Sequence, residues 1–240
     1  MTPETLLALG LIVVYLLDSL HFLRIGEAVV VTRRARPFRL SLGSGFELGG
    51  RRPFLPNPLT PFWPEMRLDW VNVADRPDEA QINTREMSER AASLKWVGIF
   101  SAVCAGSIVV GAPVALFLGA PQVFVACVAS CLISELTAAG LLLRVRGRLG
   151  LGFGQWLSLS LIGLVCLPCA ANLARAAART RCWELPAYQV AGLPLAGVEA
   201  DALRDQVREA LLRARRFVDE ESPEFRGLTE QLRLLGGAGQ

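Results

Sequence analysis

The sequence predicts a membrane α-helical protein with about four transmembrane helices, a small β-rich subdomain inserted after the first of them, and a C-terminal amphipathic helical hairpin. Composition is the first reason for this fold class. Apolar residues make up 52% of the 240 residues, charged residues make up 20%, and the mean hydropathy is +0.39. The second reason is that the apolar residues form blocks, three of which reach the ~20 residues that a helix needs to cross a bilayer.

The first helix is predicted over residues 3–23. Thr2-Pro3-Glu4 is typical of a helix start, and no Lys or Arg precedes the apolar run, which argues for a retained anchor rather than a cleaved signal peptide. Asp18 and His21 are three residues apart, so we expect them on one helix face at the membrane edge. This candidate pair would either shuttle protons or simply end the span at the headgroups.

Residues 24–76 are predicted to form a small β-rich aqueous subdomain. Short β-like runs alternate there with Gly and Pro, and about fifty residues cannot enclose much core alone, so we expect this segment to lean on the membrane. Phe62, Trp63 and Trp70 then lie either at the headgroup level or within the subdomain.

The remaining segments are predicted to be helical. Pro113 is expected to kink the second span, and apolar residues at helical spacing predict two C-terminal helices around Ser222-Pro223. The predicted segments are an aqueous helix continuing into the second span (78–118), the third span (123–143), the fourth span (155–174) and a soluble tail with a helical hairpin (182–240).

Basic residues follow the first and third predicted spans. By the positive-inside rule, four spans then place the β-rich subdomain in the cytoplasm and both termini outside, with Arg175, Arg179 and Arg181 as exceptions. Lys95 is the only lysine, a bias that indicates a GC-rich bacterial coding sequence. We therefore expect a multi-pass protein of the bacterial plasma (inner) membrane.

Glu135 lies inside the third predicted span, where a bare carboxylate costs about 2.5–3.5 kcal/mol on insertion scales. It forms either an ion, proton or substrate site, or a protonated link between helices. Ser134, Cys131 and Cys127 belong to a face of small and polar residues around it, a pattern that favours close helix packing.

Cys166 and Cys169 lie at a depth in the fourth predicted span that matches Cys131 and Cys127 in the third. These four cysteines either bind a soft metal, exchange a disulfide, or simply pack as small apolar residues. Two further contacts are considered near the outer end of the fourth span. A disulfide would join Cys169 to Cys182, and Arg175, one turn after Asn172, would extend to lipid phosphates.

Two functions remain open. The first is a non-catalytic scaffold or assembly component, because the sequence contains no recognised catalytic, nucleotide-binding or metal-binding motif; no catalytic residue, cofactor or metal is predicted. Its expected partners are the lipid bilayer and a protein or second copy bound through the C-terminal hairpin or the β-rich subdomain. The second is a small transport or thiol-redox component that uses Glu135 and the cysteines. A net charge of +3 gives no indication of nucleic-acid binding.

Overall fold

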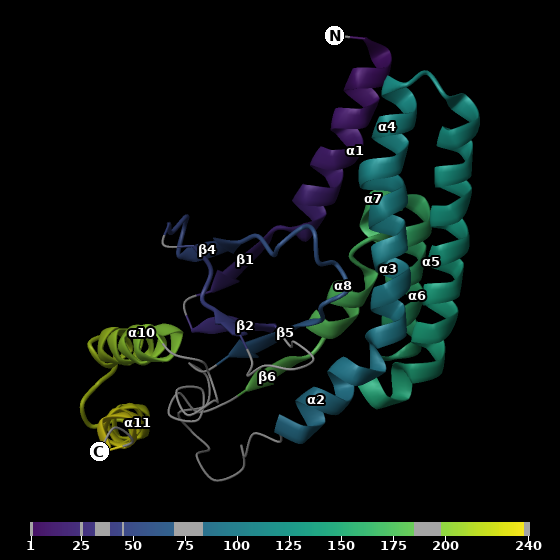
Figure 1. Cartoon of the computed structure of the whole chain (residues 1–240). Helices are drawn as coiled ribbons and strands as arrows, with labels where there is room; N and C mark the ends of the chain where they lie inside the picture. Colours follow the sequence, from purple (N-terminus) through teal and green to yellow (C-terminus); the bar gives the residue numbers. More distant parts are fainter. Residues whose placement is uncertain are drawn as a thin grey trace. The chain divides into compact units, whose positions relative to one another are not determined.

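The computed structural model describes residues 2–24, 26–31, 39–44, 46–69, 84–184 and 198–237. The chain forms two compact units, and each is described by itself. Unit 1 comprises Met1–His21, Leu55–Glu65 and Glu86–Arg181 and holds the long helices of Figure 1. Unit 2 comprises Phe22–Phe54, Met66–Arg85 and Cys182–Gln240 and holds the sheets and the C-terminal helices. Trp70 and residues 78–83 of the predicted aqueous helix lie outside the described residues.

Helix α1 (Pro3–Ser19) opens unit 1. Thr2 caps it as predicted, because its hydroxyl accepts a hydrogen bond from the backbone N–H of Thr5. The helix ends at Ser19 rather than at residue 23, since Leu20 has an extended backbone, and His21–Arg24 form strand β1. The prediction that Asp18 and His21 share a helix face is therefore wrong.

The helix predicted over 78–118 is divided by a short break and by a π-helical segment. Pro113 explains the second feature, because a proline has no backbone N–H and its ring clashes with the carbonyl four residues earlier. The backbone widens into the π-helical segment just before this proline. The elements in order are α2 (Thr84–Ser93), α3 (Lys95–Ala105), the π-helical η1 (Gly106–Gly111) and α4 (Ala112–Phe117).

Helix α5 (Pro121–Leu149) is the longest element and follows a tight turn at Gly119, which has a positive φ of 62°. It packs against α3, η1 and α4, which form one nearly continuous partner. The helix extends six residues beyond the end of the predicted third span, through Arg144, Arg146 and Arg148. It ends at Gly150, whose φ of 64° provides the left-handed C-cap.

The prediction of one continuous helix over 155–174 is wrong. The structure has three shorter helices there, α6 (Phe153–Val165), α7 (Leu167–Ala170) and α8 (Leu173–Arg179). Pro168 accounts for the interruption, since its ring would clash with the carbonyl of Leu164 in a continuing helix. Cys166, between α6 and α7, accordingly has a non-helical backbone.

The chain reverses direction across this interruption. Residues 170–171 pack with Cys104, near the end of α3, and with Cys131, near the middle of α5. Residues 173–178 of α8 pack instead with Leu94, at the start of α3, and with Leu149, at the end of α5. Because α6 also begins next to the end of α5, α6 and α8 form a helical hairpin that starts and finishes at one end of unit 1 (Figure 1).

Unit 2 contains two sheets. One pairs β1 with β4 (Arg51–Phe54), and the other has the order β3-β2-β5-β6. In the second sheet β2 runs antiparallel to β3, with Val30 opposite Leu40, and β5 runs parallel to β6, with Leu68 opposite Trp183. The strands of this sheet are β2 (Glu27–Val31), β3 (Arg39–Ser41), β5 (Glu65–Asp69) and β6 (Cys182–Glu184).

The two C-terminal helices that the sequence predicts are present as α10 (Val198–Arg215) and α11 (Pro223–Gly237), and they pack on each other. Their buried residues follow the predicted apolar stripe and include Leu203, Val207 and Leu211. The Ser222 hydroxyl caps α11 by accepting a hydrogen bond from the N–H of Phe225 (3.1 Å).

Two helical stretches in the described part of the chain are long and apolar enough to cross a membrane, Lys95–Phe117 and Pro121–Leu149. Helix α6 is apolar but has only 13 residues, and α1 has 17. The fold is thus mostly helical with a small sheet region, and the described residues do not show four full-length spans. In each long stretch only 33% of the most apolar window is buried.

We predict that Gly98→Ala destabilises unit 1. A Cβ at Gly98 would lie 2.7 Å from the backbone oxygen of Phe62, so the segment that crosses the start of α3 must move. Overpacking of this kind costs about 1–3 kcal/mol, which a lower thermal unfolding midpoint of the purified chain would report. Gly106→Ala, in the same helical stretch with nothing within 4 Å, is the control and should not lower the midpoint.

Candidate functional site

A buried arginine joins three parts of unit 1. Arg175, on α8, is 1% exposed, and its Nε lies 3.0 Å from Oε1 of Glu65. Its Nη2 donates to the backbone oxygens of Asn57 (2.7 Å) and Thr60 (2.9 Å). The guanidinium is therefore removed from water and bound by the proline-rich segment 55–65. The prediction that Arg175 extends to lipid phosphates is wrong.

Asn172 connects this arginine to the end of α1. Its Oδ1 accepts a hydrogen bond from Arg175 (3.2 Å), and its Nδ2 donates to Asp18 Oδ2 and Ser19 Oγ, both at 2.8 Å. Tyr15, one turn before Ser19, donates its hydroxyl to the backbone oxygen of Pro58 (2.6 Å). The structure thus brings Asp18 to Asn172. We call Tyr15, Asp18, Ser19, Glu65, Asn172 and Arg175 the Arg175 cluster.

The electrostatics of the Arg175 cluster are those of a buried ion pair. Burial raises the pKa of Glu65 above its ordinary value, and the positive charges of Arg175 and Arg179 counteract part of this rise. Such a pair gives little net stability relative to apolar residues, whereas removing one partner leaves a buried charge uncompensated. The cluster therefore holds segments together, and its polar groups are largely used by one another.

Glu135 is the second buried polar feature of unit 1. It is 0% exposed, in the middle of α5, and neither carboxylate oxygen has a hydrogen-bond partner among the described residues. Its carboxyl group lies against Gly163 of α6, where a Cβ would come within 2.2 Å of Oε1. Ser134, beside it, is also buried. The structure thus places Glu135 inside the bundle.

The small residues near Glu135 pack helices together, as their four-residue spacing predicted. Ser130 of α5 lies 3.3 Å from Ser107 of η1, measured between the hydroxyl oxygens. One turn away, a Cβ on Gly111 would come within 2.8 Å of the Cys127 sulfur. Cys127 therefore lies against η1.

Four of the remaining cysteines, Cys104, Cys131, Cys166 and Cys169, lie around the turn of the α6–α8 hairpin, and Cys182 belongs to β6 of unit 2. Cys166 and Cys169 form a disulfide, which rules out the considered Cys169–Cys182 bond. The thiol of Cys131 donates to the backbone oxygen of Leu167 (3.8 Å), between the two bonded cysteines. The thiol of Cys104 donates to the backbone oxygen of Cys131 (3.5 Å). Among the described residues, no group of three or more His, Cys, Asp or Glu side chains is placed to hold a metal ion.

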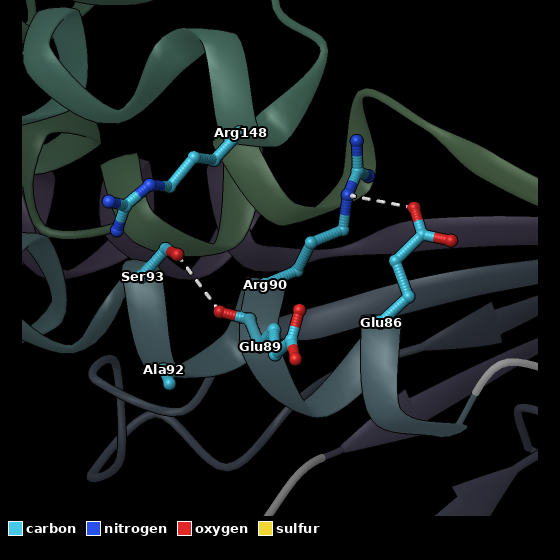
Figure 2. A pocket seen from close by; sticks show the side chains of 6 residues that line it. All are labelled: Glu86, Glu89, Arg90, Ala92, Ser93 and Arg148. Atoms are coloured by element: carbon cyan, nitrogen blue, oxygen red, sulfur yellow. Dashed lines mark hydrogen bonds and ion pairs between the residues drawn. The ribbon is translucent and has the colours of Figure 1, made fainter.

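A surface hollow of about 560 Å³ lies between α2 and the end of α5 (Figure 2). On α2, the Nε of Arg90 lies 4.0 Å from Oε1 of Glu86, one turn earlier, and Arg90 also donates to the backbone oxygen of Leu149. The Ser93 hydroxyl donates to the backbone oxygen of Glu89. Burial lowers the pKa of Arg90, although the guanidinium stays charged. The hollow is lined by Glu86, Glu89, Arg90, Ala92, Ser93 and Arg148, so both charge signs are present.

Comparison of the chain with protein-family models, with curated proteins and with solved structures found no match.

We predict that Arg175→Ala lowers the free energy of unfolding by about 3–5 kcal/mol, because it leaves Glu65 buried without its partner. Chemical unfolding of the purified chain measures this loss. Arg181→Ala is the matched control, since Arg181 pairs with Glu86 at 3.1 Å but both side chains are more than 40% exposed. Its effect should be about 1 kcal/mol or less, and equal effects of the two changes would contradict the role given to Arg175.

Proposed function

We propose that the chain is an integral membrane protein with three membrane-crossing segments, α1, α3–α4 and α5, and one re-entrant helical hairpin, α6–α8. The exposed apolar side chains of unit 1 support this placement, because large apolar patches on a soluble monomer are uncommon. Exposed side chains on these segments include Leu6, Leu7, Leu9, Val13, Val14, Leu17, Ile99, Val103, Val110, Val114, Phe117, Val123, Val125, Ile133, Leu136, Leu157, Leu161, Ile162 and Val165.

The re-entrant hairpin changes the orientation argument. With four spans, Arg175, Arg179 and Arg181 were exceptions to the positive-inside rule. Arg181 pairs with Glu86, which precedes the second span, and α8 packs beside the start of α3. These arginines then belong to the same side as Arg144, and the tail after α8 joins that side, which we assign to the cytoplasm. The N-terminus lies on the opposite side.

We further propose that the protein is a non-catalytic scaffold or assembly component of the bacterial inner membrane. The observation that carries this is the position of the Arg175 cluster. It binds together the end of α1, the segment 55–65 and α8, and each of these leads directly into unit 2. A base in which these connections to an aqueous unit are fixed by buried hydrogen bonds is suited to presenting that unit to a partner. The partner is a protein or a second copy, bound through the C-terminal helices or the sheets.

Thiol exchange is the second candidate function, and the Cys131–Leu167 contact favours it. The Cys131 thiolate would attack one sulfur of the Cys166–Cys169 disulfide and form a mixed disulfide. The other sulfur would leave as a thiolate and take up the proton that Cys131 lost, so the exchange needs no outside oxidant.

We predict that reporter fusions place the C-terminus and the loop at Gly119 on opposite sides of the membrane. A fluorescent protein that matures only in the cytoplasm should be active after Gln240, and alkaline phosphatase, which needs the periplasm, should be active when inserted at Gly119. A fusion after Gln240 that is active only as the phosphatase would restore the four-span topology and contradict the re-entrant hairpin.

We predict that removal of residues 198–237 abolishes complementation of a deletion strain, whereas Glu135→Gln combined with Ser at Cys104, Cys131, Cys166 and Cys169 preserves it. The scaffold needs the aqueous helices but no redox or acidic group within the bundle. Membrane levels of each variant are measured by immunoblot as the control. The reverse pattern, at equal membrane levels, would show that the bundle chemistry is the function.

A further inference from the structure

Two buried polar side chains of unit 1, Glu135 and Ser160, have no hydrogen-bond partner among the described residues, and they lie on two helices that pack against each other. On α5, both oxygens of Glu135 lack a partner among the described residues, and so does the Ser160 hydroxyl on α6. Ser160 and Gly163 are the buried residues of α6 and lie one turn apart on one face. Gly163 is the residue that the Glu135 carboxyl touches, so Ser160 belongs to the face that Glu135 meets.

The position of Gly163 makes room for this carboxyl. A Cβ there would lie 2.2 Å from Oε1, 2.6 Å from Cδ and 3.1 Å from Oε2, so every residue larger than glycine would displace the group. Gly154, on the same helix, has nothing within 4 Å of an added Cβ. The close approach is therefore specific to the turn of α6 that meets Glu135.

Among the described residues, no positively charged side chain pairs with Glu135. Cys131 on α5 and Cys104 on α3 are neutral or negative, and Cys166 and Cys169, at the start of α7 and within it, are joined as a disulfide. By sequence, α6, η1 and α4 carry no ionisable side chain. The basic residues of α3 and α5 begin at Lys95 and at Arg144, the latter nine residues along the helix from Glu135, about 13 Å. A buried carboxylate without a counter-charge or hydrogen bond is strongly disfavoured.

We propose that Glu135 and Ser160 form a buried proton-binding site between α5 and α6, in which the carboxyl group carries a proton at neutral pH. The alternative occupant is a metal cation. A hard cation takes about six or more oxygen ligands, while the described part of this site offers three unpartnered side-chain oxygens. The inference uses burial inside unit 1 alone and does not depend on the proposed membrane placement or scaffold role.

The test is modification of the full chain, purified in detergent, with the apolar reagent dicyclohexylcarbodiimide. A protonated carboxyl adds across a C=N bond of the reagent, and the O-acylisourea rearranges to a stable N-acylurea that mass spectrometry locates. We expect an adduct at Glu135 at pH 7, little at the exposed Glu209 and Glu230, and loss of the Glu135 adduct as the pH rises. Protection of Glu135 by added sodium or calcium at constant pH would overturn the proposal in favour of a cation site.

Matched variants distinguish modification at Glu135 from general reactivity of carboxyl groups with the reagent. Glu135→Gln should abolish the adduct, Gly163→Ala should reduce it by displacing the carboxyl, and Gly154→Ala should leave it unchanged. Ser160→Ala should move the loss of the adduct to higher pH, because a hydroxyl stabilises the carboxylate more than the neutral acid. An unchanged pH dependence would remove Ser160 from the site.

Infrared spectroscopy decides the case in which the reagent does not reach Glu135. The C=O band of a protonated carboxyl should be present in the unmodified protein at pH 7 and missing in Glu135→Gln. Absence of such a difference would overturn the proposal whatever the reagent shows.

Discussion

The buried guanidinium of Arg175 sets the constraint on which unit 1 depends. It needs a carboxylate and several carbonyl oxygens at one place, and these come from Glu65, Asn57, Thr60 and Asn172. The free-energy cost of leaving the buried guanidinium without its partner is larger than the net stabilisation that the ion pair gives. Moving any one of these groups away alone is therefore unfavourable. The proline-rich segment, which has little regular structure of its own, is thereby fixed against the helices.

The parts of the fold that the sequence could predict are those with a local cause. Thr2 caps α1, Gly119 and Gly150 mark the limits of α5, and Ser222 caps α11, each through contacts within a few residues. The turn of the α6–α8 hairpin was missed because the composition of an apolar block is the same whether it forms one long helix or two shorter ones that reverse direction. Pro168 was the available signal. Strand β6 was missed for a different reason, since its pairing partner β5 is far away in the sequence.

The residues of the candidate site also differ in whether the sequence could predict them. Glu135 could be found because a single carboxyl in an apolar helix is conspicuous. The face of small and polar residues beside it correctly predicted close helix packing, which the structure shows between Ser107 and Ser130. The Glu65–Arg175 pair could not be found, because neither residue is unusual in its own surroundings and only the tertiary structure brings them together. The roles expected for His21 and for Cys182 depended on a longer α1 and on a continuous fourth helix, which the structure does not have.

The long sequence separations within the Arg175 cluster have a consequence for how the chain folds. Asn172 and Ser19 are 153 positions apart, and Arg175 and Thr60 are 115 apart. Contacts between such distant residues form slowly, because a large loop must close before they stabilise anything. During synthesis on the ribosome, Glu65 and the carbonyls of the proline-rich segment are made long before their arginine. These early segments must remain hydrated until α8 emerges. The hydrogen bonds at the end of α1 therefore form only after the last helix of unit 1 has been made.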